Sequence, residues 1–264
     1  MEWLVRRHRG LAIVLLCTLL IAHVPARVLT WMLPESVVLS GLSGTLWSGQ
    51  AARSWVLVNQ QPVMLGQIQW RISPWRFVWS TPFQLSAEWG DQILQTRLGV
   101  GLTGQWQLHD ARMAFDLDAL GAFIPLYLGG RATSEFDLIQ FSPKRLSKAH
   151  GSVTLQNTVW TAKSGNIPLG SYRLDVGQAA QATQSPKSES PRASRAAADG
   201  IYGVLETDDG ALILTGTVSL STNDYNVDLT ATGPVARDES FRRAVSILAT
   251  PTAAGFDVLI SGQL

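Results

Sequence analysis

The sequence is poor in the residues that build disulfides and metal sites. Its 264 residues include one cysteine, Cys17, so no disulfide can form within the chain. The four histidines are His8, His23, His109 and His150, and none belongs to an HExxH motif. A structural zinc site needs about four converging His, Cys or carboxylate ligands. We therefore predict no metal site, and we expect His109 and His150 to be exposed residues at strand ends or in turns.

The sequence is also poor in charge. Charged residues make up 16% of the chain, against about 25% in a typical soluble domain. The 21 basic and 20 acidic residues leave a formal net charge of +1. Proteins that bind nucleic acid carry a surplus of Lys and Arg on one surface. This balance therefore argues against a nucleic-acid partner.

No constellation of catalytic residues is recognisable. Ser43, in GLSGT, matches only part of a nucleophile elbow, which places G-x-S-x-G between a strand and a helix. Asp116 and Asp118 lie two residues apart, a spacing typical of a solvated strand edge rather than of an acid–base pair. The glycine-rich GVGLTG is not followed by a helix, which a phosphate cradle would require. We therefore predict a protein that is not an enzyme, with no catalytic residue and no cofactor.

The longest apolar run lies near the N-terminus. Arg6, Arg7 and Arg9 precede the 12 uncharged residues Leu11–Ala22, and a second apolar patch extends to Leu33. A signal-peptide core has about 7–15 apolar residues and a spanning helix about 20, so this run lies between the two classes.

The flanking residues favour an uncleaved signal anchor over a cleaved signal peptide. Arg27 can extend to a membrane interface and Trp31 suits an interfacial belt. The alternative stays open, because Val24-Pro25-Ala26 resembles a cleavage site. By the positive-inside rule we expect residues 1–10 to be cytoplasmic, residues 11–33 to span the membrane and residues 34–264 to be exported.

Most of the remaining chain alternates apolar and polar residues. GQIQWRI and FQLSAEW show this period of two, and it continues through the C-terminal GFDVLISGQL. The pattern is typical of sheets with one buried and one wet face. Glycine, asparagine and aspartate turns separate the segments, so we predict a mainly β, antiparallel domain.

Two short segments have helical spacing instead. In Ser73–Ser80 a serine and a proline can begin a helix. In Asp238–Pro251, Phe241, Val245 and Leu248 share one helical face, and the proline ends the helix.

A low-complexity tract interrupts the alternation between Gly177 and Gly200. It contains no large apolar residue and is rich in Ala, Ser, Gln and Pro. Such a composition cannot bury enough apolar surface to offset its ordering entropy. We expect a disordered insertion at about residues 178–199, placed within one sheet because the strand pattern resumes after it.

The stretch LSGLSGTLWSGQA, Leu39–Ala51, follows the apolar N-terminus directly. Its glycines suit strand-to-strand corners, so we predict the first hairpin of the sheet with Gly44 and Gly49 at corners. We expect Trp47 to belong to the core, while an indole that faces a partner or lipid is the alternative.

Several of these stretches together resemble protein N of the bacterial type II secretion system. They are the arginine-led anchor, LPESVVLSGLSGTLWSGQA, LGQIQWRISPWRF and the C-terminal FDVLISGQL. The resemblance covers nearly the whole chain and is sharpest at Gly41–Gly49 and Trp70–Pro74. It implies a single-pass inner-membrane component with its bulk in the periplasm and a sheet that is groove-like or rolled, similar to the β folds of the AsmA group.

The resemblance also implies a function. We expect a non-enzymatic component that supports export of folded proteins from the periplasm across the outer membrane. Its expected partners are other type II secretion components, on the inner-membrane platform or the secretin side, and membrane lipid. The alternative is an AsmA-like periplasmic protein that binds lipid or maintains the envelope.

Overall fold

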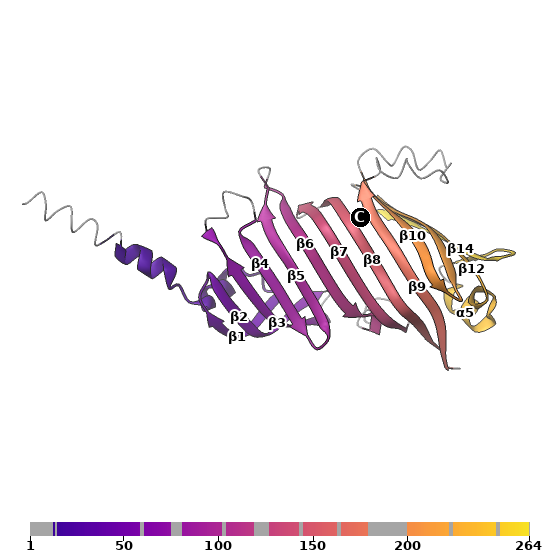
Figure 1. The fold of residues 1–264 in the computed structure, drawn as a ribbon, viewed down its shortest axis with the longest axis horizontal. Helices are drawn as coiled ribbons and strands as arrows, with labels where there is room; N and C mark the ends of the chain where they lie inside the picture. The colour runs from indigo at the N-terminus through magenta and orange to yellow at the C-terminus, as the bar shows by residue number, and fades with distance from the viewer. Residues whose placement is uncertain are drawn as a thin grey trace, which may run out of the picture. The chain divides into compact units, whose positions relative to one another are not determined.

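The computed structural model describes residues 13, 15–58, 61–74, 81–101, 104–118, 127–142, 145–162, 165–178, 200–221, 224–246 and 249–263. The chain divides into two compact units, Met1–Gly90 and Asp91–Leu264. Both are built mainly from antiparallel strands, which confirms the mainly β, antiparallel part of the predicted fold (Figure 1).

The first unit contains an antiparallel meander. Each strand pairs with the next along the chain, in the order β1-β2-β3-β4. The predicted strands GQIQWRI and FQLSAEW lie in β3 and β4. The strands are β1 (Val37–Gly44), β2 (Ser48–Val58), β3 (Gln61–Ile72) and β4 (Phe83–Trp89).

The segment expected to span a membrane, residues 11–33, is not one continuous helix. Residues 15–22 are helical, and a turn at His23 follows. A proline lacks the N–H that would continue a helix and disfavours helical backbone at the preceding residue, so the helix ends before Pro25. The chain then forms the short helices η1 (Ala26–Val28) and α2 (Leu29–Met32).

Among the residues described, no helix combines the length and the apolar character needed to cross a membrane.

The second unit is a longer antiparallel sheet. Its neighbours run in chain order from β5 to β12, and β14 then lies between β12 and β13. The predicted C-terminal strand GFDVLISGQL lies in β14. The strands are β5 (Gln92–Val100), β6 (Trp106–Asp116), β7 (Leu128–Ser142), β8 (Arg145–Ala162), β9 (Gly165–Gln178), β10 (Ile201–Gly210), β11 (Ile213–Leu220), β12 (Asp224–Thr232), β13 (Thr250–Pro251) and β14 (Gly255–Gln263).

The low-complexity tract joins two neighbouring strands. Gln178 at the end of β9 pairs with Ile201 at the start of β10. The tract is therefore an insertion within one sheet, as predicted. Of the expected disordered insertion, residues 178–199, Gln178 is paired in β9, and residues 179–199 lie outside the described residues.

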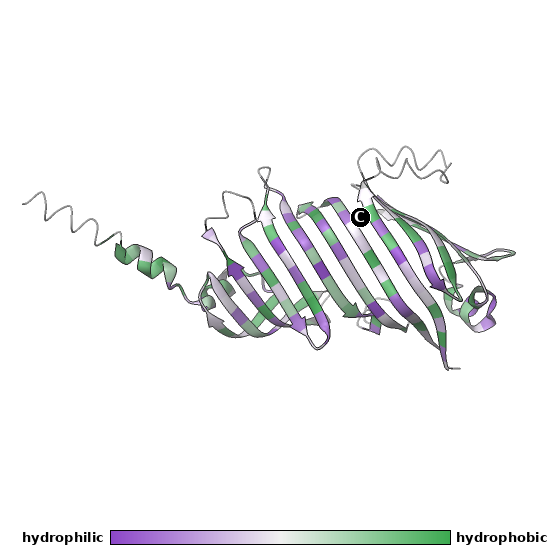
Figure 2. Ribbon diagram, in the orientation of Figure 1, coloured by the Kyte–Doolittle hydropathy of each residue, from purple (hydrophilic) through white to green (hydrophobic). Residues whose placement is uncertain are grey.

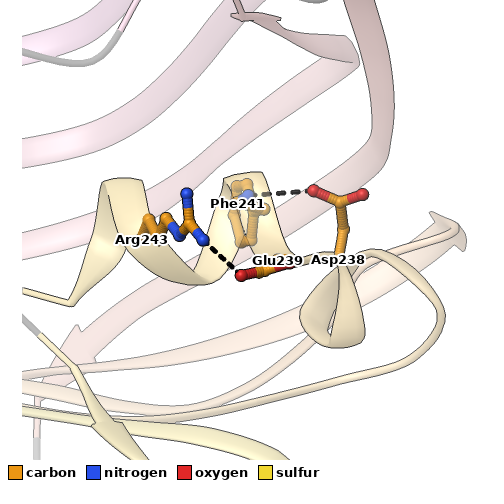
Figure 3. A network of polar contacts seen from close by, with 4 residues as sticks. All are labelled: Asp238, Glu239, Phe241 and Arg243. Carbon is orange, nitrogen blue, oxygen red and sulfur yellow. Dashed lines mark hydrogen bonds and ion pairs between the residues drawn. The ribbon is translucent and has the colours of Figure 1, made fainter.

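One of the two predicted helices is present but shorter than predicted. It ends at Val245 instead of continuing to Pro251, because Thr250 and Pro251 pair with β14 as strand β13. A short helix η4 (Val235–Arg237) precedes α5 (Glu239–Val245), and Asp238 caps α5 by accepting a hydrogen bond from the Phe241 amide at 3.0 Å (Figure 3). The other prediction, Ser73–Ser80, falls mostly on residues 75–80, which lie outside the described residues.

The sheet of the second unit has one apolar and one polar face. Side chains at paired positions of neighbouring strands project from the same face, and apolar and polar residues alternate along the strands (Figure 2). One paired row on the apolar face contains Met113, Val153, Leu174, Leu205, Leu229 and Val258, with Ser134 and Gly216 between them. The adjacent row on the polar face contains Arg112, Glu135, Ser152, Asp175 and Asp228, with Val204 and Thr217 between the last two.

The apolar face curves around α5. The Phe241 ring lies 5.2 Å from the ring of Trp160 on β8 and 5.8 Å from the ring of Phe256 on β14, between ring centroids. In a flat sheet these strands, five spacings of about 4.8 Å apart, would be separated by about 24 Å. One phenyl ring can contact both only because the sheet is rolled here (Figure 1). The buried core consists of Trp160, Leu169, Tyr172, Leu212, Ala231, Val235, Ala236, Phe241 and Phe256.

Candidate functional site

His109 and His150 lie within strands. His109 is in β6 and His150 in β8, so their expected positions at strand ends or in turns are wrong. Each faces Leu138 of β7 in the pairing register. Burial, and then the nearby charge of Arg97, lowers the pKa of His109. Within the described part of the chain, no three His, Cys, Asp or Glu side chains are grouped to hold a metal ion.

The residues considered for catalysis are not assembled into a site. Ser43 is exposed on β1 opposite Gln50, and the turn after it leads into a strand rather than a helix. Asp116 ends β6 opposite Arg131, while Asp118 is exposed just beyond the strand. The segment GVGLTG leads from β5 into strand β6, although its residues 102–103 lie outside the described set.

The first hairpin is formed as predicted. Gly44 pairs with Gly49 at the end where β1 turns into β2. Gly44 has a φ of +89°, in the left-handed region that favours glycine. A Cβ at Gly44 would lie 2.5 Å from the Ser48 carbonyl oxygen, and a Cβ at Gly49 would lie 2.5 Å from Cζ2 of Trp70. Both corners therefore require glycine.

The turn of this hairpin holds the end of the N-terminal helix. We call Thr45–Trp47 the junction turn. The indole N–H of Trp47 donates a hydrogen bond to the Ile21 carbonyl at 2.8 Å, and the Leu46 amide donates to the Val24 carbonyl at 2.8 Å. Pro25 and Thr45 form an isolated antiparallel bridge. Carbonyl groups at the end of a helix lack partners within the helix, and the junction turn supplies donors to two carbonyls in this region.

The junction turn is also fixed to β3. The indole N–H of Trp70 donates to the Leu46 carbonyl at 3.1 Å, and the Ile72 amide donates to the Trp47 carbonyl at 2.6 Å. Trp47 is half-buried, so the expectation that it is a core residue is wrong. The reason is its place in the turn, beyond the paired strands, where it meets the helix end instead of the face of the sheet.

The helix α5 is surrounded by both polar and apolar side chains. A cavity of about 390 Å³ lies beside this helix. Glu239 and Arg243 form an ion pair on the exposed side of the helix (Figure 3). The cavity is lined by Glu239, Arg242, Arg243, Val245, Ser246, Ala249, Pro251 and Phe256.

One tyrosine hydroxyl is buried below this cluster. Tyr172 of β9 donates a hydrogen bond to the Leu212 carbonyl at 2.9 Å. Burial raises the pKa of Tyr172 to about 12, because the anionic form is poorly solvated there. The hydroxyl therefore acts as a structural donor.

The contacts that sequence reasoning missed join distant segments. Trp47 and Ile21 are 26 residues apart, and Tyr172 and Leu212 are 40 residues apart. Strand periodicity reports only on neighbours along the chain. The one local signal was the glycine-rich context of Trp47, which indicated a tight turn but not its partner.

Residues 35–258 match a family model described as type II secretion system (T2SS), protein N. Two curated relatives carry the name "Type II secretion system protein N". The one from Vibrio cholerae serotype O1 (strain ATCC 39315 / El Tor Inaba N16961) is 28% identical over 175 residues, covering 60% of this chain and 63% of the relative. The one from Aeromonas hydrophila is 34% identical over 166 residues, covering 60% of this chain and 62% of the relative.

The chain thus spans a little under two thirds of the length of these curated relatives. No solved structure matches it. The expected likeness to the AsmA folds stays a prediction.

Proposed function

This chain belongs to the family of type II secretion system protein N, and from that membership we propose that it is a non-enzymatic component of a type II secretion apparatus. Its role would be to support the export of folded proteins from the periplasm across the outer membrane. The observation that carries the proposal is the extent of the family match, residues 35–258, which runs from before β1 into β14.

The partners that we propose are other secretion components, on the inner-membrane platform or on the secretin side. The architecture suits a scaffold, because long antiparallel sheets present strand edges that other chains can extend. The experiment is deletion of the encoding gene, followed by complementation with the full chain. Secretion substrates should accumulate folded in the periplasm of the deletion strain and return to the medium on complementation. Unchanged export in the deletion strain would overturn the proposal.

We further propose a location. Residues 1–10 would be cytoplasmic, residues 11–33 would anchor the chain in the inner membrane, and residues 34–264 would lie in the periplasm. Support comes from the arginines that precede the apolar run, and from apolar side chains of the N-terminal helix that are exposed among the described residues. Those exposed side chains are Ile13, Leu15, Leu16, Leu19, Leu20 and Ile21.

Sequencing the N-terminus of the membrane-purified protein tests this location. We expect the chain to begin at or near Met1 and to resist extraction by carbonate. A mature chain that begins near Arg27 would instead show that the apolar segment is a cleaved signal peptide.

A second candidate function is the binding of lipid in the periplasm. The observation that favours it is the apolar face of the second unit, whose row from Met113 to Val258 is only half-buried apart from the buried Ser134. Such a continuous apolar surface suits acyl chains. The cavity beside α5 adds Arg242, whose guanidinium group would bind an anionic head group, while Arg243 is already paired with Glu239.

Photo-crosslinking in cells separates this candidate from a purely structural face. A benzophenone amino acid at Leu174 projects from the apolar face, and one at Arg173 projects from the polar face as the matched control. Lipid adducts at position 174 and none at position 173 are expected if the face holds lipid. Equal or absent lipid labelling at both positions would contradict it.

A further inference from the structure

The outer edge of β14 is open beyond its first residues. β12 covers one side of β14 over its whole length, from Gly255 to Gln263. On the other side β13 pairs only with Phe256 and Asp257. Within the part of the chain that the structure describes, no strand pairs with this side from Val258 onward.

The register shows which backbone groups point outward there. The Thr252 amide donates to the Gly255 carbonyl at 2.9 Å, and the Gly255 amide donates to Oγ1 of Thr252 at 3.2 Å, so both backbone groups of Gly255 face the β13 side. In an antiparallel strand every second residue turns both backbone groups to the same side. The pairing with β12 has no register shift. The N–H and C=O groups of Leu259 and Ser261 therefore point outward and have no partner strand.

This edge lacks the usual features that prevent strand addition. Natural edge strands are protected by bulges, prolines, lysines or very short length. The segment Val258–Gln263 contains no proline and no charge. By contrast, the pairing of β1 with β2 is interrupted at Gly41, whose φ is +68°. Leu259 is also 67% exposed, the highest value for a large apolar side chain on a described strand. The next highest is Ile213, which is 44% exposed.

The surface beside this edge is acidic. Asp224 and Asp228 of β12 and Asp257 of β14 share the face from which Leu259 projects, because they are paired with Gln263, Leu259 and Thr230 in one register. The strands β11, β12 and β14 contain no lysine or arginine. A strand added to β14 would lie two strand spacings, about 10 Å, from Asp224 and Asp228 of β12, and a long lysine or arginine side chain on this face can extend across that distance toward the carboxylates.

We infer that the edge Val258–Gln263 binds an extended segment of another protein, which adds a strand to β14. The backbone of that segment pairs with Leu259 and Ser261. On the face of Leu259 it carries an apolar side chain that covers this leucine and a lysine or arginine beside the acidic residues. This inference rests on the proposed function, in which the chain contacts other secretion components.

The experiment measures binding of a labelled peptide to the full chain in detergent. The probe is a fluorescent peptide of seven residues, Lys-Thr-Val-Thr-Lys-Thr-Val, in which lysine and valine alternate along one face of the strand, and the comparison probe replaces lysine by glutamate. The valine–lysine peptide should bind to the wild-type chain at least about tenfold more tightly than the valine–glutamate peptide at low salt.

The decisive variant is Ser261→Pro. Because the Ser261 N–H points away from β12, proline there removes an outward donor without breaking a bond of the existing sheet. We expect the valine–lysine peptide to bind at least about tenfold more weakly to Ser261→Pro and normally to the matched control Ser261→Ala. An unchanged melting temperature in both variants shows that the sheet is intact. If Ser261→Pro lowers it, a valine–lysine peptide N-methylated on its edge-facing amides replaces the variant and should bind at least about tenfold more weakly.

Three results would overturn the inference: no binding of the valine–lysine peptide, equal binding to the wild type and Ser261→Pro, or a wild-type dimer that Ser261→Pro dissociates. The last would show that a second copy of this chain occupies the edge. Failure of the proposed function is distinguishable from these results. It would appear as normal secretion in the deletion strain, with peptide binding in vitro unaffected.

Discussion

The junction turn of the first unit and the α5 cluster of the second hold their segments in different ways. At the junction turn, backbone amides and two indole N–H groups bind carbonyls of the N-terminal segment and of the hairpin. At α5, aromatic rings pack against one another, and the Asp238 carboxylate fixes the start of the helix. The first arrangement is directional and half-exposed, and the second is apolar and buried.

This difference indicates what each region contributes. A net hydrogen bond stabilises a protein by about 1 kcal/mol, whereas a buried aromatic side chain contributes several times as much. The α5 cluster should therefore dominate the stability of its unit. The junction turn should mainly fix the orientation of the N-terminal helix relative to the first hairpin.

The largest effect is expected at the centre of the α5 cluster. Phe241→Ala should destabilise the chain by about 3–5 kcal/mol, because it removes contacts with Trp160 and Phe256 and leaves a cavity. Phe241→Leu is the control and should cost about 1–2 kcal/mol. Urea unfolding of both variants measures this, and a loss below about 1 kcal/mol for Phe241→Ala would contradict the central place of this ring.

An intermediate effect is expected at the corner of the first hairpin. Gly49→Val should cost about 1–3 kcal/mol, because its Cβ would meet the Trp70 ring and the Ser43 carbonyl oxygen at 2.5 and 2.6 Å. Gly44→Val should cost a similar amount. Gly90→Ala is the control for backbone strain alone, since it has a φ of +57° and no atom within 4 Å of the added Cβ. Thermal unfolding that ranks Gly90→Ala as the worse change would refute the steric explanation.

A smaller effect is expected at the indole of the junction turn. Trp47→Phe removes the hydrogen bond to Ile21 and should cost about 1 kcal/mol. It should also increase protease cleavage near His23, because the end of the helix is released from the hairpin. Trp55→Phe, a half-buried tryptophan of β2, is the matched control. Equal cleavage rates in the wild type and Trp47→Phe would show that this bond does not hold the segment.

The buried tyrosine of the second unit should affect stability mainly at high pH. The pKa of Tyr172 is about 12 in the folded chain and about 10 in an unfolded chain. Between pH 10 and 12 mainly the unfolded chain releases this proton, so the free energy of unfolding should fall as pH rises through this range. Below pH 10 Tyr172 should cause no pH dependence of the stability. Tyr172→Phe should make the fall shallower in urea unfolding. A tyrosine titration with every midpoint near 10 would contradict the burial argument.

The smallest effect is expected in the insertion between β9 and β10. Replacing residues 179–200 by Asn-Gly leaves Gln178 and Ile201 paired across a two-residue hairpin loop. Stability and secretion should stay within the error of the wild type, because the composition of the tract predicts no packed structure. In the wild-type chain, limited proteolysis should cut this tract first. Protection of the tract from protease would show that the predicted disorder is wrong.

Much of the fold could be predicted because its signals are local. Alternation in FQLSAEW predicted β4 with the bounds that the structure shows, Phe83–Trp89. Asp238 and the helical spacing of Phe241 and Val245 predicted α5. The expectations for His109, His150 and Trp47 were less accurate, because the position of a side chain relative to other strands does not follow from its neighbours along the chain.

The sequence by itself determined the strands, their two-faced pattern, the capped helix and the glycine corners, since each depends on residues within one or two turns of the chain. Only the tertiary structure decided that Trp47 binds Ile21, that Phe241 lies between Trp160 and Phe256, and that the edge of β14 stays open from Val258. These features depend on how strongly the sheet curves and on which strand lies at its edge. Both follow from contacts between segments that are distant in the chain, where no local periodicity carries a signal.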